Sequence, residues 1–262
     1  MNTFIIGSCS VEKKSFFSKL ALDLSNLFKP YSVDFYLKGS FDKANRSSIK
    51  GNRGPGLKKA IKIFQHVKDK NPGIKLSTDV HEVWQVEKLV NIIDCVQVPA
   101  FLCRQTDLLT ECAKHFSIVN IKVGQWMSPQ NMCKGIDKLK TINSNCKVWA
   151  TVRGTQLGYH QLVVDFSSVD ILNKVFDKVI LDCTHSTQRL KSSGFTGGDA
   201  VLGKRHMLAA PIYGFDGVFA ETHYTPEISY SDADSVINFR DIKPILHSLC
   251  KKDYDVLVGS LR

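Results

Sequence analysis

Eight short runs rich in valine and isoleucine recur along the whole chain, and segments with apolar residues at helical spacing lie between them. Strands buried on both faces give such continuous apolar runs, and their alternation with helices implies parallel pairing through right-handed crossovers. The runs cover residues 4–8, 33–38, 75–80, 95–99, 118–123, 147–152, 178–183 and 217–222. Eight strand–helix units predict an α/β fold, a closed (β/α)8 TIM barrel, which uses roughly 250 residues as one domain.

Three of the intervening segments show a helical period clearly. They carry Phe17, Leu20, Leu24 and Leu27 after the first run, Val83, Val86, Val90 and Ile93 after the third, and Met132, Ile136, Leu139 and Ile142 after the fifth. An open doubly wound sheet is the competing fold, but no G-x-G-x-x-G turn follows the first run. No linker or composition shift divides the sequence, so we expect residues 1–262 to form a single barrel domain.

The composition excludes several classes of protein. With 43% hydrophobic and 23% charged residues, the chain is an ordinary globular one and not a disordered one. No apolar run approaches the roughly 20 residues that cross a bilayer, and the N-terminus lacks the basic region of a signal peptide. The eight cysteines are scattered, mostly within apolar runs, and are predicted to be reduced thiols in a cytoplasmic protein.

The net charge of +10 allows nucleic acid, an anionic membrane or phosphorylated metabolites as partners. Lysine-rich surface helices without any single partner would account for the same excess. Nucleic-acid binding calls for basic residues spread over one face and interleaved with exposed aromatics, which this sequence does not suggest. We therefore expect neither nucleic acid nor membrane as a partner.

Polar side chains stand at or just after the end of each predicted strand. In a barrel these ends meet at one opening, where enzymes of this fold carry their active sites. The residues are Cys9, Lys38, Asp79, Gln97, Lys122, Arg153, His185 and Glu221, and the long loops 39–56, 154–161 and 186–203 also follow strands. Such groups are costly beside buried strands unless they pair or bind something, so we expect a ligand.

Two sets of residues, at the strand ends and in the loops that follow them, indicate particular ligands. The cations suit a phosphorylated substrate, because the guanidinium fork binds phosphate in a bidentate manner and lysine supplies a point charge. A second set combines thiolate, imidazole and carboxylates, which suit a divalent transition metal. Salt bridges and simple packing are the alternatives, since the second set has no close spacing of the C-x-x-C kind. The sets are Lys38, Lys43, Arg46, Arg104, Lys122 and Arg153, and Cys9, His185, Glu221 and Asp232.

Segments along nearly the whole chain resemble those of the 3-deoxy-D-manno-octulosonate 8-phosphate (KDO8P) synthases. The most specific are KGSFDKANRSS at residues 38–48 and QVPAFLCRQTDLL at residues 97–109. Others in the same order lie at residues 78–82, 120–122, 124–129, 153–155, 182–186 and 216–219. The resemblance implies that phosphoenolpyruvate condenses with the aldehyde of D-arabinose 5-phosphate, giving KDO8P and inorganic phosphate for lipopolysaccharide synthesis.

The resemblance also implies roles for individual residues. Lys43, Asp79 and His185 would lie near the reacting groups, and Asn45 would contact the sugar. Arg46 and Ser47 would hold the pentose phosphate, with Arg104 reaching in from a neighbouring subunit of a homotetramer. Arg153 would bind the phosphate of phosphoenolpyruvate, and Lys38, Gln97, Ala100 and Lys122 would complete the substrate site. Cys9 is similar to the cysteine of the metal-dependent type, so Cys9, His185, Glu221 and Asp232 would bind zinc, iron, manganese or a similar ion.

Five positions depart from the family pattern. Val123 stands where a second lysine is usual, Val152 replaces a glutamate, His160-Gln161 replaces two asparagines, and Ala200 replaces an arginine. A lost charge-assisted contact costs about 1.5–3 kcal/mol, so phosphate binding could be tenfold weaker, and a lysine at position 123 is expected to restore it. Three hypotheses stay open: an active synthase, a weakened relative that binds without efficient turnover, and a sister aldol-type synthase that uses another aldose.

Overall fold

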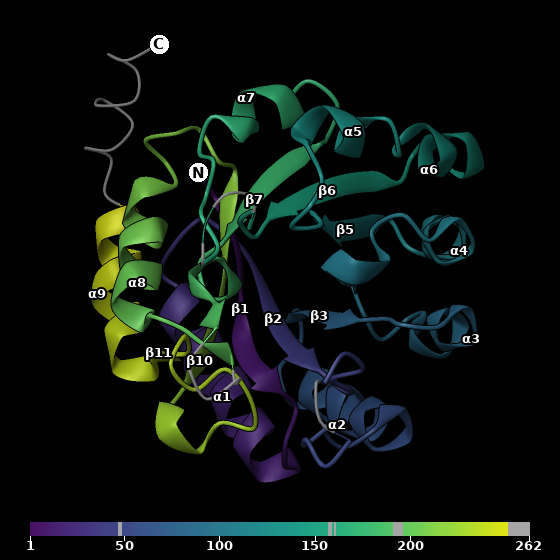
Figure 1. The fold of residues 1–262 in the computed structure, drawn as a ribbon. Coiled ribbons are helices and arrows are strands. Elements are labelled where there is room, and N and C mark those ends of the chain that lie inside the picture. Colours follow the sequence, from purple (N-terminus) through teal and green to yellow (C-terminus); the bar gives the residue numbers. More distant parts are fainter. Residues whose placement is uncertain (47–48, 157–158, 160, 191–195, 251–262) are drawn as a thin grey trace.

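The computed structural model describes residues 1–46, 49–156, 159, 161–190 and 196–250. Its eight apolar runs form parallel strands, each paired with the next, and the last pairs with the first to close a barrel (Figure 1). The strands are β1 (Thr3–Ser10), β2 (Asp34–Ser40), β3 (Lys75–Asp79), β4 (Cys95–Val98), β5 (Ile118–Lys122), β6 (Lys147–Val152), β7 (Lys178–Asp182) and β10 (Gly217–His223). The predicted (β/α)8 TIM barrel is therefore confirmed.

Helices surround the barrel and cover the outer faces of its strands (Figure 1). The α-helices are α1 (Lys14–Phe28), α2 (Leu57–Lys70), α3 (Val83–Val86), α4 (Thr106–His115), α5 (Pro129–Cys133), α6 (Asp137–Ile142), α7 (Ser168–Leu172), α8 (Ala200–Ala209) and α9 (Phe239–Leu249). Short 3-10 helices are η1 (Glu87–Leu89), η2 (Ala100–Leu102), η3 (His185–Thr187) and η4 (Pro226–Ile228). Among the described residues, none of these helices has both the length and the apolar character needed to span a bilayer.

Three minor strands lie beyond the barrel strands. β8 (Arg189–Leu190) and β9 (Thr196–Gly197) pair with each other in antiparallel fashion. β11 (Ile237–Asn238) runs parallel to β10 and extends that edge of the barrel wall. Because β11 pairs with the C-terminal end of β10, the segment between these two strands lies at the C-terminal end of the barrel. There it contributes to the site described below.

Two helices are shorter than their apolar periods predict. The helical period of residues 83–93 gives only one α-turn and η1, because Val90 adopts an extended ψ of 142° and Asn91 has a left-handed φ of 67°. The period of residues 132–142 divides into α5 and α6, and Ile142 is 44% exposed. Apolar spacing reports which face is buried, and that face can continue across a break in the helix.

Among the described residues, the apolar side chains inside the barrel gather toward the N-terminal ends of the strands. A cluster of Ile5, Tyr36, Cys95, Trp149, Ile180 and Phe219 forms a floor there, while a larger cluster lies between strands and helices. Side chains alternate along a strand, so residues two and four positions beyond the floor also face inward. On β2 these are Lys38 and Ser40, which are both buried. The inward-facing polar groups thus stand above the floor, at the C-terminal mouth.

Candidate active site

Lys38, Ser40 and Asp79 form one side of the barrel mouth. The Nζ atom of Lys38 lies 3.2 Å from Oδ1 of Asp79 and donates to the Ser40 hydroxyl at 2.8 Å. The Ser40 hydroxyl and the Gln97 amide both donate to the Asp79 carboxylate. Burial alone would raise the pKa of Asp79, but the charges of Lys38 and Lys43 outweigh it and lower that pKa. Asp79 is therefore an ionised carboxylate whose hydrogen bonds fix its position.

Asp182 organises the opposite side of the mouth. Its carboxylate lies 2.6 Å from Nζ of Lys122 and 2.9 Å from Nδ1 of His185, and it accepts the backbone N–H groups of Thr184 and His185. Burial would raise the pKa of Asp182, yet the neighbouring His185 and Lys122 hold it well below the usual value. A carboxylate that holds one ring nitrogen fixes the direction of the other. Nε2 of His185 accordingly lies 3.6 Å from Oε1 of Glu221.

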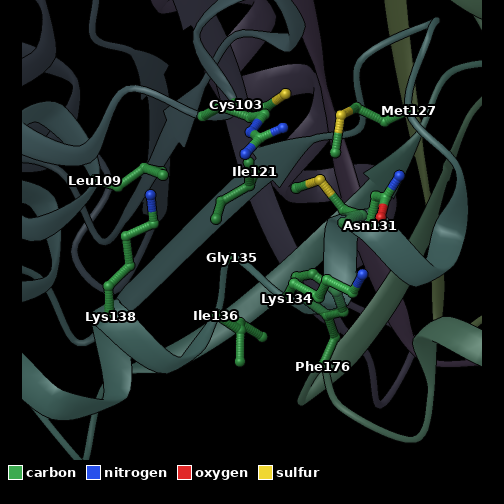
Figure 2. A pocket seen from close by; sticks show the side chains of 12 residues that line it. Cys103, Leu109, Ile121, Met127, Asn131, Lys134, Gly135, Ile136, Lys138 and Phe176 are labelled. Carbon is green, nitrogen blue, oxygen red and sulfur yellow. The ribbon is translucent and has the colours of Figure 1, made fainter.

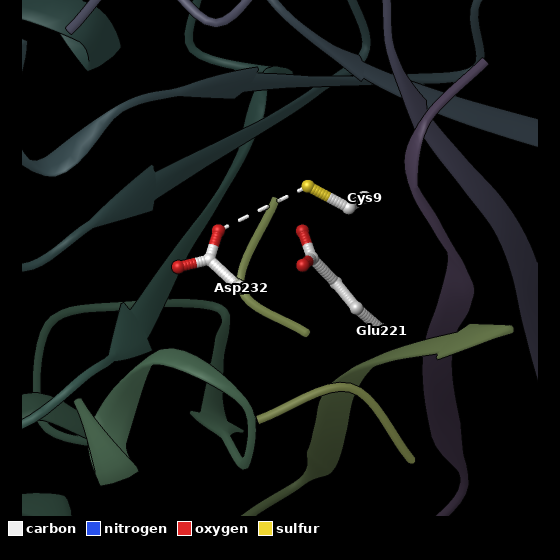
Figure 3. A group of neighbouring side chains, drawn as sticks. All are labelled: Cys9, Glu221 and Asp232. Carbon is white, nitrogen blue, oxygen red and sulfur yellow. Dashed lines mark hydrogen bonds between the residues drawn. The ribbon is translucent and has the colours of Figure 1, made fainter. Parts of the chain in front are cut away.

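Cys9, Glu221 and Asp232 converge from β1, β10 and the segment before β11 (Figure 3). One ligand atom of each lies within 4.8 Å of those of the other two, and Sγ of Cys9 lies 3.9 Å from Oδ2 of Asp232. Oε2 of Glu221 is buried without a hydrogen-bond partner. Thiol, carboxylates and the adjacent imidazole of His185 form a donor set that fits a divalent transition metal, which would complete the unsatisfied carboxylate.

Lys43 joins the two sides of the mouth. Its Nζ atom lies 3.6 Å from Oε1 of Glu221 and donates to the Ser40 hydroxyl at 3.2 Å. Burial would lower the pKa of Lys43, but Cys9, Glu221 and Asp79 outweigh burial and raise it. The lysine is therefore a fixed cation at the centre of the site.

The two arginines flank this centre. Arg153 is 6% exposed and donates to the side chain of Gln188 and, at 3.3 Å, to the carbonyl oxygen of His185. Arg46 donates to the Ser231 hydroxyl at 2.5 Å and to the Tyr230 carbonyl oxygen at 3.2 Å. Neither arginine forms an ion pair with a carboxylate in the described part of the chain, so both guanidinium groups suit an anionic ligand.

Most of the predicted site residues surround one opening. Hydrogen bonds and close charge pairs connect Cys9, Lys38, Lys43, Arg46, Asp79, Gln97, Lys122, Arg153, His185, Glu221 and Asp232. Groups separated by more than 200 residues in the sequence are thus neighbours, as the barrel prediction required. Their individual roles stay predictions.

Three predicted site residues lie apart from this network. Asn45 is exposed, and no hydrogen bond connects its side chain to the described residues. Ala100 is buried at the start of η2. Arg104 is exposed and lines a separate cavity of about 190 Å³ with Lys134 and Lys138, beside β5 and between α4, α5 and α6 (Figure 2). Ser47 lies outside the described residues, as does His160.

The structure adds site residues that the sequence analysis did not select. Ser40 and Asp182 face inward at strand ends, so strict alternation from Lys38 and Ile180 identifies both. Gln188 and Ser231 lie outside the barrel strands, where no period indicates which side chain enters the site. Their hydrogen bonds to Asp232, and those that Gln188 accepts from Arg153 and Ser231 from Arg46, bring them into the network.

The departures at positions 123 and 152 have a structural explanation. Val123 directly follows the inward-facing Lys122, and Val152 directly precedes the inward-facing Arg153. Both valines belong to the apolar cluster outside the barrel wall. Neither valine therefore occupies a position among the inward-facing groups of the mouth. Ala200 is the first residue of α8, whose N-cap Asp199 accepts the Leu202 N–H at 2.9 Å.

A parallel barrel with a cationic mouth beside side chains that could hold a metal ion defines a TIM-barrel enzyme suited to anionic substrates. The chain belongs to the DAHP synthetase I family, with a match over residues 2–257. A 2-dehydro-3-deoxyphosphooctonate aldolase of Wolinella succinogenes is 41% identical over 256 residues, which cover 94% of this chain and 97% of the relative. Enzymes of that name from Helicobacter acinonychis and Campylobacter jejuni are 40% and 39% identical, with 94% of each chain covered. Because this name denotes KDO8P synthase, the resemblance seen in the motifs is confirmed.

Proposed function

We propose that this protein is a KDO8P synthase, which condenses phosphoenolpyruvate with D-arabinose 5-phosphate in lipopolysaccharide biosynthesis. The observation that carries the proposal is the grouping of Lys38, Lys43, Lys122, Arg46 and Arg153 around one opening. Five cations at one barrel mouth match two phosphate esters and a carboxylate. The relatives at about 40% identity support the same reaction.

In this reaction C3 of phosphoenolpyruvate attacks the aldehyde carbon, water adds at C2, and the C2–O bond to phosphate breaks. Arg153, which is buried and fixed at Gln188, would bind the phosphate of phosphoenolpyruvate. Arg46 and Ser47 would bind the pentose phosphate. Lys43 would donate a hydrogen bond to the aldehyde oxygen as it gains negative charge, which is where a preorganised cation lowers the barrier.

The proposal includes a divalent transition metal such as zinc, iron or manganese. Cys9, Glu221 and Asp232 would hold it, together with Nε2 of His185, and the buried unpaired oxygen of Glu221 supports this assignment. When bound, the ion would orient the water or the aldehyde and stabilise developing negative charge. Asp182 would keep the imidazole of His185 directed at the metal position through its hydrogen bond to Nδ1.

We further propose that residues 1–262 act as one catalytic domain in a cytoplasmic homotetramer, with Arg104 completing the site of a neighbouring subunit. Arg104 follows η2, where Phe101 is 56% exposed and stacks on Trp126, with 5.7 Å between ring centroids. Exposed aromatic pairs are enriched in interfaces between subunits. Light scattering tests the proposal: we expect tetramers for the native chain and smaller species for Phe101→Ala/Trp126→Ala.

Phosphate release in the presence of both substrates tests the function directly. We expect release only when both are present, loss of activity after chelation, and recovery on addition of a divalent metal. Turnover with erythrose 4-phosphate or an N-acetyl sugar in place of the pentose phosphate would indicate the sister synthase. Binding of both substrates without turnover would indicate the weakened relative, and absence of binding would contradict the proposal.

A further inference from the structure

A continuous chain of hydrogen bonds connects Arg46 to Arg153 through Asp232. Arg46 donates to the Ser231 hydroxyl at 2.5 Å, and that hydroxyl donates to Oδ2 of Asp232 at 2.5 Å. From the other end, Arg153 donates to Oε1 of Gln188, and Nε2 of Gln188 donates to Oδ1 of Asp232 at 2.8 Å. Each carboxylate oxygen of Asp232 is thus connected to one arginine through one neutral side chain.

The direction of every proton in this chain is fixed. A guanidinium can only donate and an ionised carboxylate can only accept, so each linking side chain must accept on one side and donate on the other. Serine and glutamine both do this. A carboxylate at position 188 would face the carboxylate of Asp232, and an apolar residue would satisfy neither neighbour.

The backbone at Asp232 is held by neighbouring contacts as well. Asp232 has a φ of 55°, in the left-handed region that aspartate adopts more often than most residues other than glycine. Such a conformation persists when surrounding contacts hold it. The carbonyl oxygen of Asp232 accepts the N–H of Ser235 at 2.7 Å, while the Ser231 and Gln188 bonds hold its side chain.

From this chain we infer that Ser231 and Gln188 are positioning residues, each of which ties one phosphate-binding arginine to the carboxylate of Asp232. The inference rests on the proposed function, in which Arg46 binds the pentose phosphate, Arg153 binds the phosphate of phosphoenolpyruvate and Asp232 binds the metal. Ser231 would then set the pentose phosphate site and the metal site together. Gln188 would set the phosphoenolpyruvate site and the same metal site.

The test compares Ser231→Ala with Gln188→Leu in the full chain. Calorimetry measures the binding of each substrate alone to the metal-loaded protein, where no turnover occurs. Competition with a chromophoric chelator measures the affinity for zinc. We expect both variants to weaken zinc binding by about tenfold or more, the usual effect of losing a group that orients a metal ligand. Ser231→Ala should lower only the affinity for arabinose 5-phosphate, by about 10- to 100-fold. Gln188→Leu should lower only the affinity for phosphoenolpyruvate, by a similar factor.

This crossed pattern separates positioning from general damage to the fold. Ser231→Thr keeps the hydroxyl and should retain native affinities, and Gln188→Asn, which is too short to bridge, should behave like Gln188→Leu if the latter does not fold. Ser168→Ala is the matched control, because it removes a buried serine hydroxyl whose hydrogen bond runs to the backbone carbonyl oxygen of Asp165, and no hydrogen bond within the described residues connects that hydroxyl to Asp232 or to either arginine.

Two results would overturn the inference. The first is an unchanged zinc affinity in both variants, and the second is an equal loss of affinity for the two substrates in both variants. If the native protein binds neither substrate, the proposed function fails instead. The zinc measurements then decide by themselves whether Ser231 and Gln188 position Asp232.

Discussion

Replacing Asp182 with asparagine tests how the barrel mouth holds its charges. The substitution keeps the shape of the side chain but removes the only carboxylate that pairs with Lys122 among the described residues. The side chains of Lys122 and Asp182 are 8% and 0% exposed, so water cannot replace the lost partner. We therefore expect that replacing one carboxylate oxygen by an amide nitrogen greatly lowers the free energy of unfolding.

The size of the effect follows from the geometry. Unit charges 2.6 Å apart, the separation of Lys122 and Asp182, attract by about 6 kcal/mol at an effective dielectric constant of about 20. Desolvation of the two groups offsets part of this attraction, and breaking a buried pair from one side costs about 3–5 kcal/mol. For a chain of this length that loss lowers the melting temperature by about 6 to 20 °C.

Chemical and thermal unfolding, followed by circular dichroism, measure the loss. Asp34→Asn is the matched control, because Asp34 also contacts two lysines, Lys75 and Lys178, but is 38% exposed. Screening by water limits the cost of that change to about 1 kcal/mol or less. The Asp182→Asn/Lys122→Met double variant removes both buried charges and should be more stable than Asp182→Asn alone.

The pH dependence gives a second check. Asp182 has a lowered pKa in the folded protein, so its contribution to stability is complete well above the unfolded value of about 3.9. It disappears as the pH falls through the folded pKa, and the difference between the native chain and Asp182→Asn should shrink with it. If Asp182→Asn costs no more than Asp34→Asn at neutral pH, the reasoning about buried charges at this site is refuted.

Three further changes test other parts of the site. Arg46→Ala should raise the KM for arabinose 5-phosphate by about 10- to 100-fold and leave the KM for phosphoenolpyruvate within about twofold; the opposite pattern in steady-state kinetics would contradict the assignment. Burial raises the pKa of the Cys9 thiol to about 12, so a metal must displace its proton, and zinc affinity above pH 7 should rise about tenfold per pH unit in the native chain but lose this dependence in Cys9→Ala. Val123→Lys places a cation in the outer apolar cluster, so it should lower the unfolding free energy by about 1 kcal/mol or more without tightening phosphoenolpyruvate binding, and tighter binding would restore the expectation from the family pattern.

The amino-acid pattern alone predicted the barrel and most of its mouth. Buried parallel strands must be apolar on both faces, so their eight runs were visible without any tertiary information. Since strand ends meet at one edge of a barrel, residues such as Cys9, Lys38 and His185 could be assigned to one opening in advance. Motifs such as residues 38–48 then indicated the reaction through their resemblance to a known family.

The contacts between these side chains became known only from the folded chain. Gln188 and Ser231 come from loops, where no repeating period relates sequence position to direction, so their bonds to Asp232 could not be inferred from the sequence. The separation of Arg104 from the mouth could not be inferred from the sequence either. Local periodicity reports which face of an element is buried, whereas the partner of a polar side chain depends on residues that approach from distant parts of the chain.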